Sequence, residues 1–155
     1  MSSAIEQRLA ARGLELPDAP APAANYVPYT ISGKLLFVAG QLPFRKGQVA
    51  VIGYVDDEVS VEQGQEAARI CALNVLAQAK AACGGDLSRL ARCVKLGGFV
   101  ACGRTFTRHP EVINGASDLM VEAMGEAGQH ARFAVGCASL PRGAAVEVEA
   151  IFELA

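Results

Sequence analysis

The stretch Ala131-Arg-Phe-Ala-Val-Gly-Cys-Ala-Ser-Leu-Pro-Arg-Gly-Ala-Ala-Val-Glu-Val-Glu-Ala150 decides the fold predicted for this protein. It contains two runs with β-strand character, 132–139 and 144–154, joined by the turn-forming tetrapeptide Leu140-Pro-Arg-Gly143. Two short strands joined by a tight turn favour a β-hairpin. We therefore expect these runs to pair with each other.

Strand residues alternate between the two faces of a sheet, so this hairpin predicts which side chains share a face. An even loop pairs Phe133 with Ala150 and Val135 with Val148, which gives an apolar face beneath the helices. The opposite face would combine one arginine with carboxylates and small residues: Arg132, Ala134, Gly136, Ala138, Glu147, Glu149, Ile151 and Glu153. Such a face is either a solvated sheet surface with salt bridges or a surface covered by a ligand or another subunit. The small residues favour the second interpretation.

Two amphipathic helices are predicted before this stretch. Ser60-Val-Glu-Gln63 matches a capping box, and apolar residues recur behind it at helical spacing until Gly84-Gly85. A second helix begins near Pro110 and closes at Gly125 or Gly128.

Strands are predicted around these helices. The runs 26–31 and 34–38 flank Ser32-Gly33 as a hairpin, a third strand covers 48–54, and a fourth covers 93–101. The order predicts an α+β fold, in which two helices lie on one face of a mixed sheet and the other face needs a cover.

The first 24 residues form a separate segment in this prediction. Residues 1–13 have helical character up to Gly13, and 16–24 are an Ala/Pro spacer of extended conformation. We expect residues 1–24 to be an arm that packs on the domain or on a neighbouring subunit, and residues 25–155 to be the domain itself.

Composition narrows the possible classes of protein. A chain of 155 residues suffices for one hydrophobic core, and its 52% hydrophobic content suggests a subunit interface. The net charge is -2 with scattered basic residues, so we expect no nucleic-acid partner. We also expect no membrane partner and a cytoplasmic location, because the sequence has neither a long apolar run nor a signal-peptide pattern.

The five cysteines and two histidines do not have the spacing of a disulfide framework or a zinc site. We interpret the cysteines as small buried side chains in a reducing compartment, and expect no metal.

Several motifs together resemble the YjgF/RidA family, the reactive intermediate deaminases, also known as endoribonuclease L-PSP or translation initiation inhibitor. The main one is the quoted stretch, with Ala-Arg, an alternating strand, Leu-Pro and alternating Glu and aliphatic residues. Further matches are Gly40-Gln-Leu-Pro43, Tyr26 and Asn114. The N-terminal arm and two longer loops resemble a divergent subfamily.

The resemblance implies a chorismate-mutase-like fold assembled as a homotrimer, with clefts between subunits. It implies that Arg132 binds a carboxylate and that Glu147 is the catalytic residue. Tyr26, Gly40, Asn114 and Ala134 fall on other positions of the substrate-binding cleft. Ala134 replaces a cysteine of the best-known members, so no role of that thiol carries over. Tyr26 and Asn114 also have plain structural interpretations, as a packed strand residue and a helix-start hydrogen bonder.

The function implied is hydrolysis of reactive enamines or imines of 2-amino acids to 2-keto acids and ammonia, without a cofactor. The planar guanidinium of Arg132 suits a small carboxylate-bearing partner, a 2-imino or 2-keto acid, and Glu147 suits a water-orienting base. A non-catalytic trimer that binds small carboxylates remains an alternative. A ribonuclease or translation inhibitor is disfavoured by the net acidity.

Overall fold

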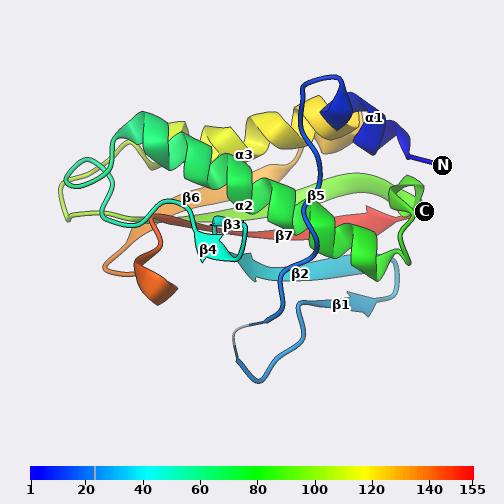
Figure 1. The fold of residues 1–155 in the computed structure, drawn as a ribbon, viewed down its shortest axis with the longest axis horizontal. Helices are drawn as coiled ribbons and strands as arrows, with labels where there is room; N and C mark the ends of the chain where they lie inside the picture. The colour runs from blue at the N-terminus through cyan, green and yellow to red at the C-terminus, as the bar shows by residue number, and fades with distance from the viewer. Residues whose placement is uncertain (23) are drawn as a thin grey trace.

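Helices cover one face of a five-stranded mixed sheet in the computed structural model, which describes residues 1–22 and 24–155 (Figure 1). The sheet order is β1-β2-β7-β5-β6; β5 and β6 are parallel and the other neighbours are antiparallel. The predicted α+β class is confirmed. The helices are α1 (Ala4–Ala10), α2 (Val61–Ala82) and α3 (His109–Met124), and the strands are β1 (Tyr29–Ser32), β2 (Leu35–Gln41), β3 (Phe44–Arg45), β4 (Gln48–Val49), β5 (Leu90–Ala101), β6 (Ala131–Cys137) and β7 (Val146–Leu154).

Helix α2 begins at the predicted capping box. The Gln63 backbone N–H donates to Ser60 Oγ at 3.0 Å, and the Ser60 N–H donates to Gln63 Oε1 at 2.8 Å. These two bonds satisfy backbone donors that a helix start leaves without partners. The chain leaves the helix direction at Gly84, where φ is 68°. Both predicted ends of this helix are confirmed to within a few residues.

Helix α3 packs closely against α2. A Cβ at Gly115 would overlap the backbone of Gln65, so only glycine permits this approach. The helix starts one residue before Pro110 and ends at Gly125, where φ is 64°. Its apolar face is buried, which confirms the predicted second helix.

The predicted C-terminal hairpin is wrong, because β5 lies between β6 and β7. The residues of α3 connect β5 to β6, and a connection that contains a helix permits a parallel pair with the helix above the sheet. Pro141–Gly143 forms a short 3₁₀ turn in the connection from β6 to β7. Phe133 therefore pairs with Gly97 rather than with Ala150.

The observed strand pairing changes which side chains lie on the same face of the sheet. Arg132 pairs with Leu96, and Leu96 pairs with Ala150, so Arg132 lies on the helix side of the sheet. Ala134 and Gly136 follow it on that side. Phe133, Val135 and Cys137 are wrongly placed by the hairpin prediction, since they lie on the side away from the helices. Glu147 and Glu149 lie there too, because they pair with Phe99 and Gly97.

The face away from the helices is partly apolar and uncovered in this single chain. Val135 is 43% exposed and Phe37 is 37% exposed, while Phe99 and Phe133 pack edge to face with centroids 5.3 Å apart. Lys95 Nζ lies 5.4 Å from the Phe133 ring centroid. We call this surface the open sheet face.

The first predicted hairpin is confirmed, with its turn at Gly33, where φ is 60°. The strand predicted over 48–54 is wrong beyond Val49: β4 is short and pairs only with β3. Gly53 adopts a positive φ of 121°, which an extended strand does not permit.

The N-terminal segment packs on its own chain. Ile5 and Leu9 of α1 are buried in the main core. Glu6 forms an ion pair with Lys80 of α2 at 2.6 Å, and Arg8 donates to the carbonyl of Ala123 at 3.3 Å. Within the described residues, no helix has both the length and the apolar composition needed to cross a bilayer.

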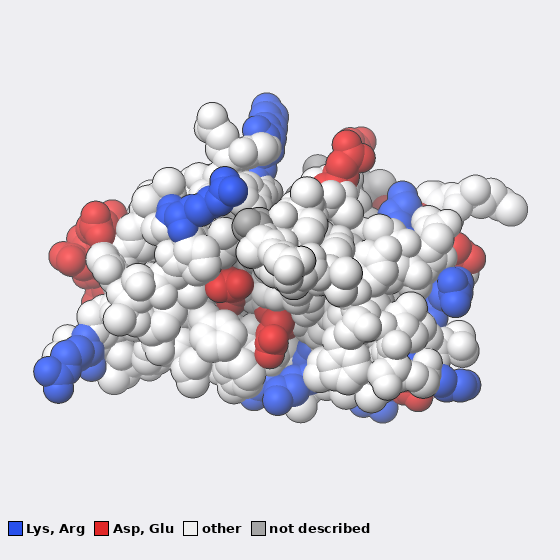
Figure 2. Space-filling view, turned by 90° about the horizontal axis from the view of Figure 1, so that it is seen from below, with Lys and Arg blue, Asp and Glu red and all other residues white. Residues whose placement is uncertain are grey.

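Seen from the β1 side, the surface is largely uncharged (Figure 2). Acidic side chains lie near the middle of this view, and basic side chains are dispersed around it. A surface that follows a nucleic-acid backbone needs its basic groups gathered along one path. This face does not present such a path.

Candidate functional site

A pocket of about 240 Å³ brings together three of the residues expected at the site, Tyr26, Gly40 and Glu147. Glu147 projects from β7 towards the irregular end of β2, where the register with β7 shifts between Val38 and Gln41. A Cβ at Gly40 would overlap the Glu147 carboxylate, so glycine is required for this close approach. We call this cavity the Glu147 pocket.

The environment of Glu147 makes its carboxyl group harder to ionise than an exposed one. Burial raises the pKa of the Glu147 carboxyl above its usual range, and the neighbouring charge of Glu149 raises it further. A carboxyl group in such a setting exchanges protons closer to neutral pH than an exposed one does. Acid–base chemistry is therefore available at this position.

Buried amides of α2 hold the walls of the pocket in place. Gln78 is 1% exposed; its Nε2 donates to the carbonyl of Pro20 at 2.5 Å and to Gln41 Oε1 at 3.4 Å. Asn74, one turn earlier, donates to the carbonyls of Leu42 and Phe44, each at 3.0 Å. The spacer segment and the loop after β2 are thus both tied to one helix.

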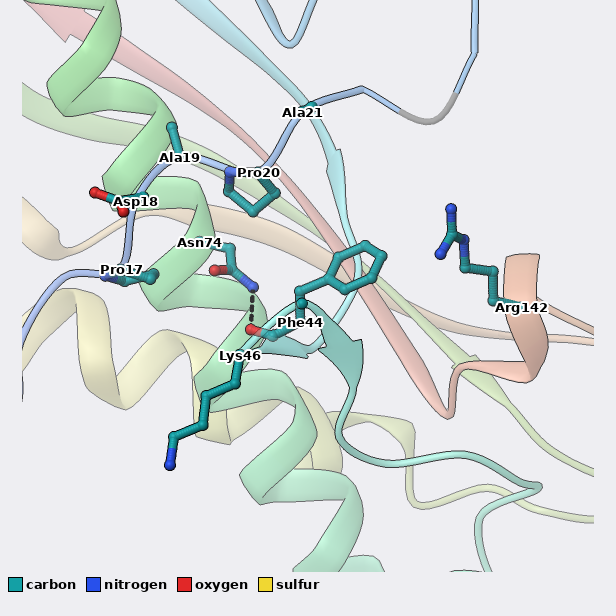
Figure 3. A pocket seen from close by; sticks show the side chains of 10 residues that line it. Pro17, Asp18, Ala19, Pro20, Ala21, Phe44, Lys46, Asn74 and Arg142 are labelled. Carbon is teal, nitrogen blue, oxygen red and sulfur yellow. Dashed lines mark hydrogen bonds between the residues drawn. The ribbon is translucent and has the colours of Figure 1, made fainter.

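A second pocket, of about 370 Å³, lies beside the first and shares Pro20, Ala21 and Phe44 with it (Figure 3). The amide of Asn74 points into the region between the spacer and the β3–β4 hairpin, and the Arg142 guanidinium lies 5.4 Å from the Phe44 ring centroid. The spacer segment therefore forms a wall common to both pockets.

Arg132 lies elsewhere, against the first turns of α3. Its Nη1 donates to Ser117 Oγ at 3.1 Å and its Nη2 donates to the carbonyl of Pro110 at 3.2 Å. Among the described residues no carboxylate forms an ion pair with it. These neutral partners hold the guanidinium in place and leave its charge available to an anion.

Asn114 and Ala134 lie with Arg132 rather than with Glu147. Pro110, Asn114 and Ser117 follow the spacing of one helix face, and Arg132 contacts the first and last of them. Asn114 is exposed, in the second turn of α3 rather than at its start. Ala134 is the next residue of β6 on the same side as Arg132. Arg132, Asn114, Ala134 and Ser117 are called the Arg132 cluster below.

One chain does not bring the two groups together. Arg132 and Glu147 lie on opposite faces of the sheet, with β5 between their strands. Strand spacing and rise place their Cα atoms roughly 14 Å apart. The hairpin register had wrongly placed them on one face.

Three features of the site were not predicted. Ser117, Gln78 and Asn74 carry polar groups at partly or fully buried helix positions. The signal for the two amides is present in the sequence, because they interrupt the apolar face of α2 at positions four residues apart. In the described part of the chain, no group of three or more His, Cys, Asp or Glu side chains has the arrangement of a metal site.

The fold and the two groups define a class: an α+β protein with an open sheet face, a pocket that contains the carboxyl group of Glu147, and an arginine that donates to two neutral acceptors on the other side of the sheet. Residues 6–154 match the family described as "YjgF/chorismate mutase-like, putative endoribonuclease". The chain belongs to this family.

Similar proteins span nearly the whole chain. Protein TCP17 of Trypanosoma cruzi is 49% identical over 154 residues, which are 99% of this chain and 96% of that protein. The structure of protein Atu1372 from Agrobacterium tumefaciens is 53% identical with a TM-score of 0.93, covering 98% of this chain and 93% of the other. A "putative endoribonuclease" from Shewanella oneidensis MR-1 is 38% identical with a TM-score of 0.93, covering 97% and 99%.

Proposed function

We propose that this protein is an imine or enamine deaminase, which hydrolyses reactive 2-imino acids to 2-keto acids and ammonia at clefts between the subunits of a homotrimer. Membership of the YjgF family supports this general role. The observation that carries the proposal is the separation of the two groups within one chain: the Glu147 pocket has the acid–base group, and the Arg132 cluster has the anion-binding group.

The open sheet face supports the assembly. Exposed apolar side chains such as Val135 and Phe37 gain free energy when a second copy covers them. A cyclic assembly places one edge of a subunit beside a different edge of its neighbour. In this arrangement, the Arg132 cluster of one chain completes the Glu147 pocket of the next.

The chemistry needs a held substrate and a positioned water. Arg132 grips the substrate carboxylate with its planar guanidinium. A water molecule adds to the protonated imine carbon and gives one proton to Glu147, and the carboxyl then returns this proton to the nitrogen. The C–N bond breaks, ammonia leaves, and loss of the remaining hydroxyl proton gives the keto group.

The raised pKa of Glu147 supports both halves of this cycle, because the group accepts a proton from water and releases it to the departing nitrogen. Tyr26 and the backbone at Gly40 line the same pocket and define where the polar end of the substrate lies. Holding the reactants in place suffices for a reaction that already occurs in water.

The direct test is ammonia release from 2-iminobutanoate generated in the assay, measured against buffer alone. The wild-type protein should accelerate release, whereas Arg132→Ala and Glu147→Gln should not. Arg104→Ala, which changes an exposed arginine of the β5–α3 loop, is the matched control and should remain active.

Two other outcomes would replace the proposal. Binding of 2-keto acids without any acceleration of ammonia release would indicate a carboxylate-binding protein without catalysis. RNA cleavage that survives extensive purification and is lost in Glu147→Gln would indicate a ribonuclease.

A further inference from the structure

Cys102 and His109 form a thiol–imidazole pair that the proposed deaminase chemistry does not use. Cys102 Sγ lies 3.4 Å from His109 Nε2. Cys102 follows the end of β5, and His109 is the first residue of α3. The loop between them brings the two side chains into contact. The two residues had no recognisable ligand spacing in the sequence. The interpretation of the cysteines as buried side chains is confirmed for Cys71, Cys83 and Cys93, and is wrong for the half-buried Cys102 and Cys137.

The surroundings leave space for the pair and fix the imidazole. A Cβ at Gly136 would lie 2.7 Å from both Cys102 Sγ and His109 Nε2, so the absence of a side chain there is necessary. The Phe106 ring packs edge to face on the His109 ring, with centroids 5.1 Å apart and an interplanar angle of 84°. This contact orients the imidazole towards the sulfur.

Cys102 also lines an open pocket of about 400 Å³. The loop before α2 and the loop after β5 form the walls of this pocket. Two lining residues are acidic, Asp56 and Asp57, and among the described residues that line it none is basic: Tyr54, Val55, Asp56, Asp57, Cys102, Gly103, Thr105 and Phe106.

Burial raises the pKa of the Cys102 thiol above its ordinary value. A hydrogen bond with the backbone of Cys137 lowers this pKa but offsets only part of the rise. The resting group is therefore a neutral thiol, which is a weak nucleophile. Activation requires a base within hydrogen-bonding reach, and His109 Nε2 is in that position.

We propose that Cys102 and His109 form a reactive thiol site, distinct from the Glu147 pocket, that takes small uncharged or cationic electrophiles such as aldehydes. The thiol proton moves to His109 Nε2 as the sulfur adds to the carbonyl carbon. The C=O π electrons move to the oxygen, which receives the proton from the imidazolium, and a hemithioacetal results. The acidic lining disfavours anionic reagents.

Cys137 provides an internal control for the test. It is half-buried like Cys102, and burial raises the pKa of its thiol too, but its Sγ contacts the carbonyl of Val100 at 3.5 Å instead of an imidazole. The other three cysteines are buried. Rates of alkylation by iodoacetamide at pH 7, followed by peptide mass spectrometry, compare the two sites in one sample.

The expected result is that Cys102 reacts at least tenfold faster than Cys137. His109→Gln should lower the Cys102 rate about tenfold and leave the Cys137 rate unchanged, while His130→Gln should alter neither. Equal rates at the two cysteines, or a Cys102 rate that does not respond to His109→Gln, would overturn the proposal. A change at both cysteines in His109→Gln would show a general disturbance of structure, and the proposal would then fail unless His109→Asn lowered the Cys102 rate alone.

The preference for charge has a separate readout. Aminoethyl and sulfonatoethyl methanethiosulfonates have the same reactive group and opposite charges. The cation-to-anion rate ratio should be higher at Cys102 than at Cys137, and Asp56→Asn with Asp57→Asn should reduce it. An unchanged ratio would show that the acidic lining does not select the reagent. Because no imine is present, these measurements do not depend on the deaminase proposal.

Discussion

Replacing Arg132 with alanine should weaken ligand binding strongly and lower the stability of the protein only slightly. The guanidinium contacts two neutral acceptors, Ser117 Oγ and the Pro110 carbonyl, at 3.1 and 3.2 Å. Ser117 keeps its 2.8 Å hydrogen bond to His130 Nε2 when Arg132 is removed, and water can reach the carbonyl of the exposed Pro110. The loss of folding free energy should therefore stay near 1 kcal/mol.

The loss of binding should be much larger. Removing one partner of a charge-assisted pair in a partly desolvated cleft costs about 2 to 5 kcal/mol. At 1.4 kcal/mol for each factor of ten, the Kd for a small 2-keto acid should rise about 30-fold to several thousandfold. Arg132→Lys retains the charge but not the planar pair of donors, so it should recover only part of the affinity.

Calorimetric titration with pyruvate, together with thermal melts of both variants and of Arg104→Ala, provides the measurement. Intact keto-acid binding in Arg132→Ala, with a strongly lowered melting temperature, would refute the role of Arg132 as anchor. That result would assign the arginine a structural role at the α3–β6 contact.

Further predictions concern other parts of the molecule. Sedimentation equilibrium should give a trimer for the wild-type chain and smaller species for Val135→Asp, because the substitution places a charge on the open sheet face; a wild-type monomer at micromolar concentration would contradict this. Glu147→Gln should lower the deaminase rate about 10²- to 10⁴-fold. The same variant should melt higher than the wild type at pH 7 and equally below pH 4.5, since the raised carboxyl pKa makes stability fall as pH rises through it. The ion pair with Lys80 lowers the pKa of Glu6 to about 2, so the stability it adds should be lost as pH falls from 4.5 towards 2, and Glu6→Gln should then melt like the wild type. Treatment with a chelator should change neither melting nor activity, and loss of either would reveal a metal site.

The helices were predictable because their signals are local. The capping box at Ser60 and Gln63 involves residues three apart, and the apolar stripe of α2 repeats at the helical period. Both signals depend on neighbours within one turn. They therefore indicate a helix regardless of how the rest of the chain folds.

The strand order was not predictable from alternation alone. A strand such as β6 shows the same alternation whether its neighbour is β5 or β7, so the parity of Phe133 and Val135 carries no information about the partner. The decisive signal was the helix between β5 and β6. A strand, a crossover helix and another strand in one sheet favour a parallel pair, and this rule displaces the hairpin.

The sequence supplied candidate residues for the site, but it did not supply their arrangement. Similarity to family motifs selected Glu147 and Arg132 as single positions. Their relation depends on the strand order, and the error there placed them on one face. The pair of Cys102 and His109 was missed for a different reason: only the closure of the loop between β5 and α3 brings the two side chains into contact.

In the proposed deaminase, the separation of the Glu147 pocket from the Arg132 cluster lets substrate selectivity change while the chemistry stays the same. Glu147 belongs to β7, whereas the pocket walls formed by the spacer and by the loop after β2 are held to α2 by Gln78 and Asn74. Substitutions in these walls should therefore change the shape of the pocket without moving Glu147. Within one chain, Arg132 is held by α3 on the other side of the sheet, away from the spacer. Selectivity for the substrate side chain should therefore follow the spacer, whereas recognition of the carboxylate should follow Arg132. Exchanging the spacer between relatives should change which imine is preferred and leave the affinity for the shared carboxylate group nearly constant.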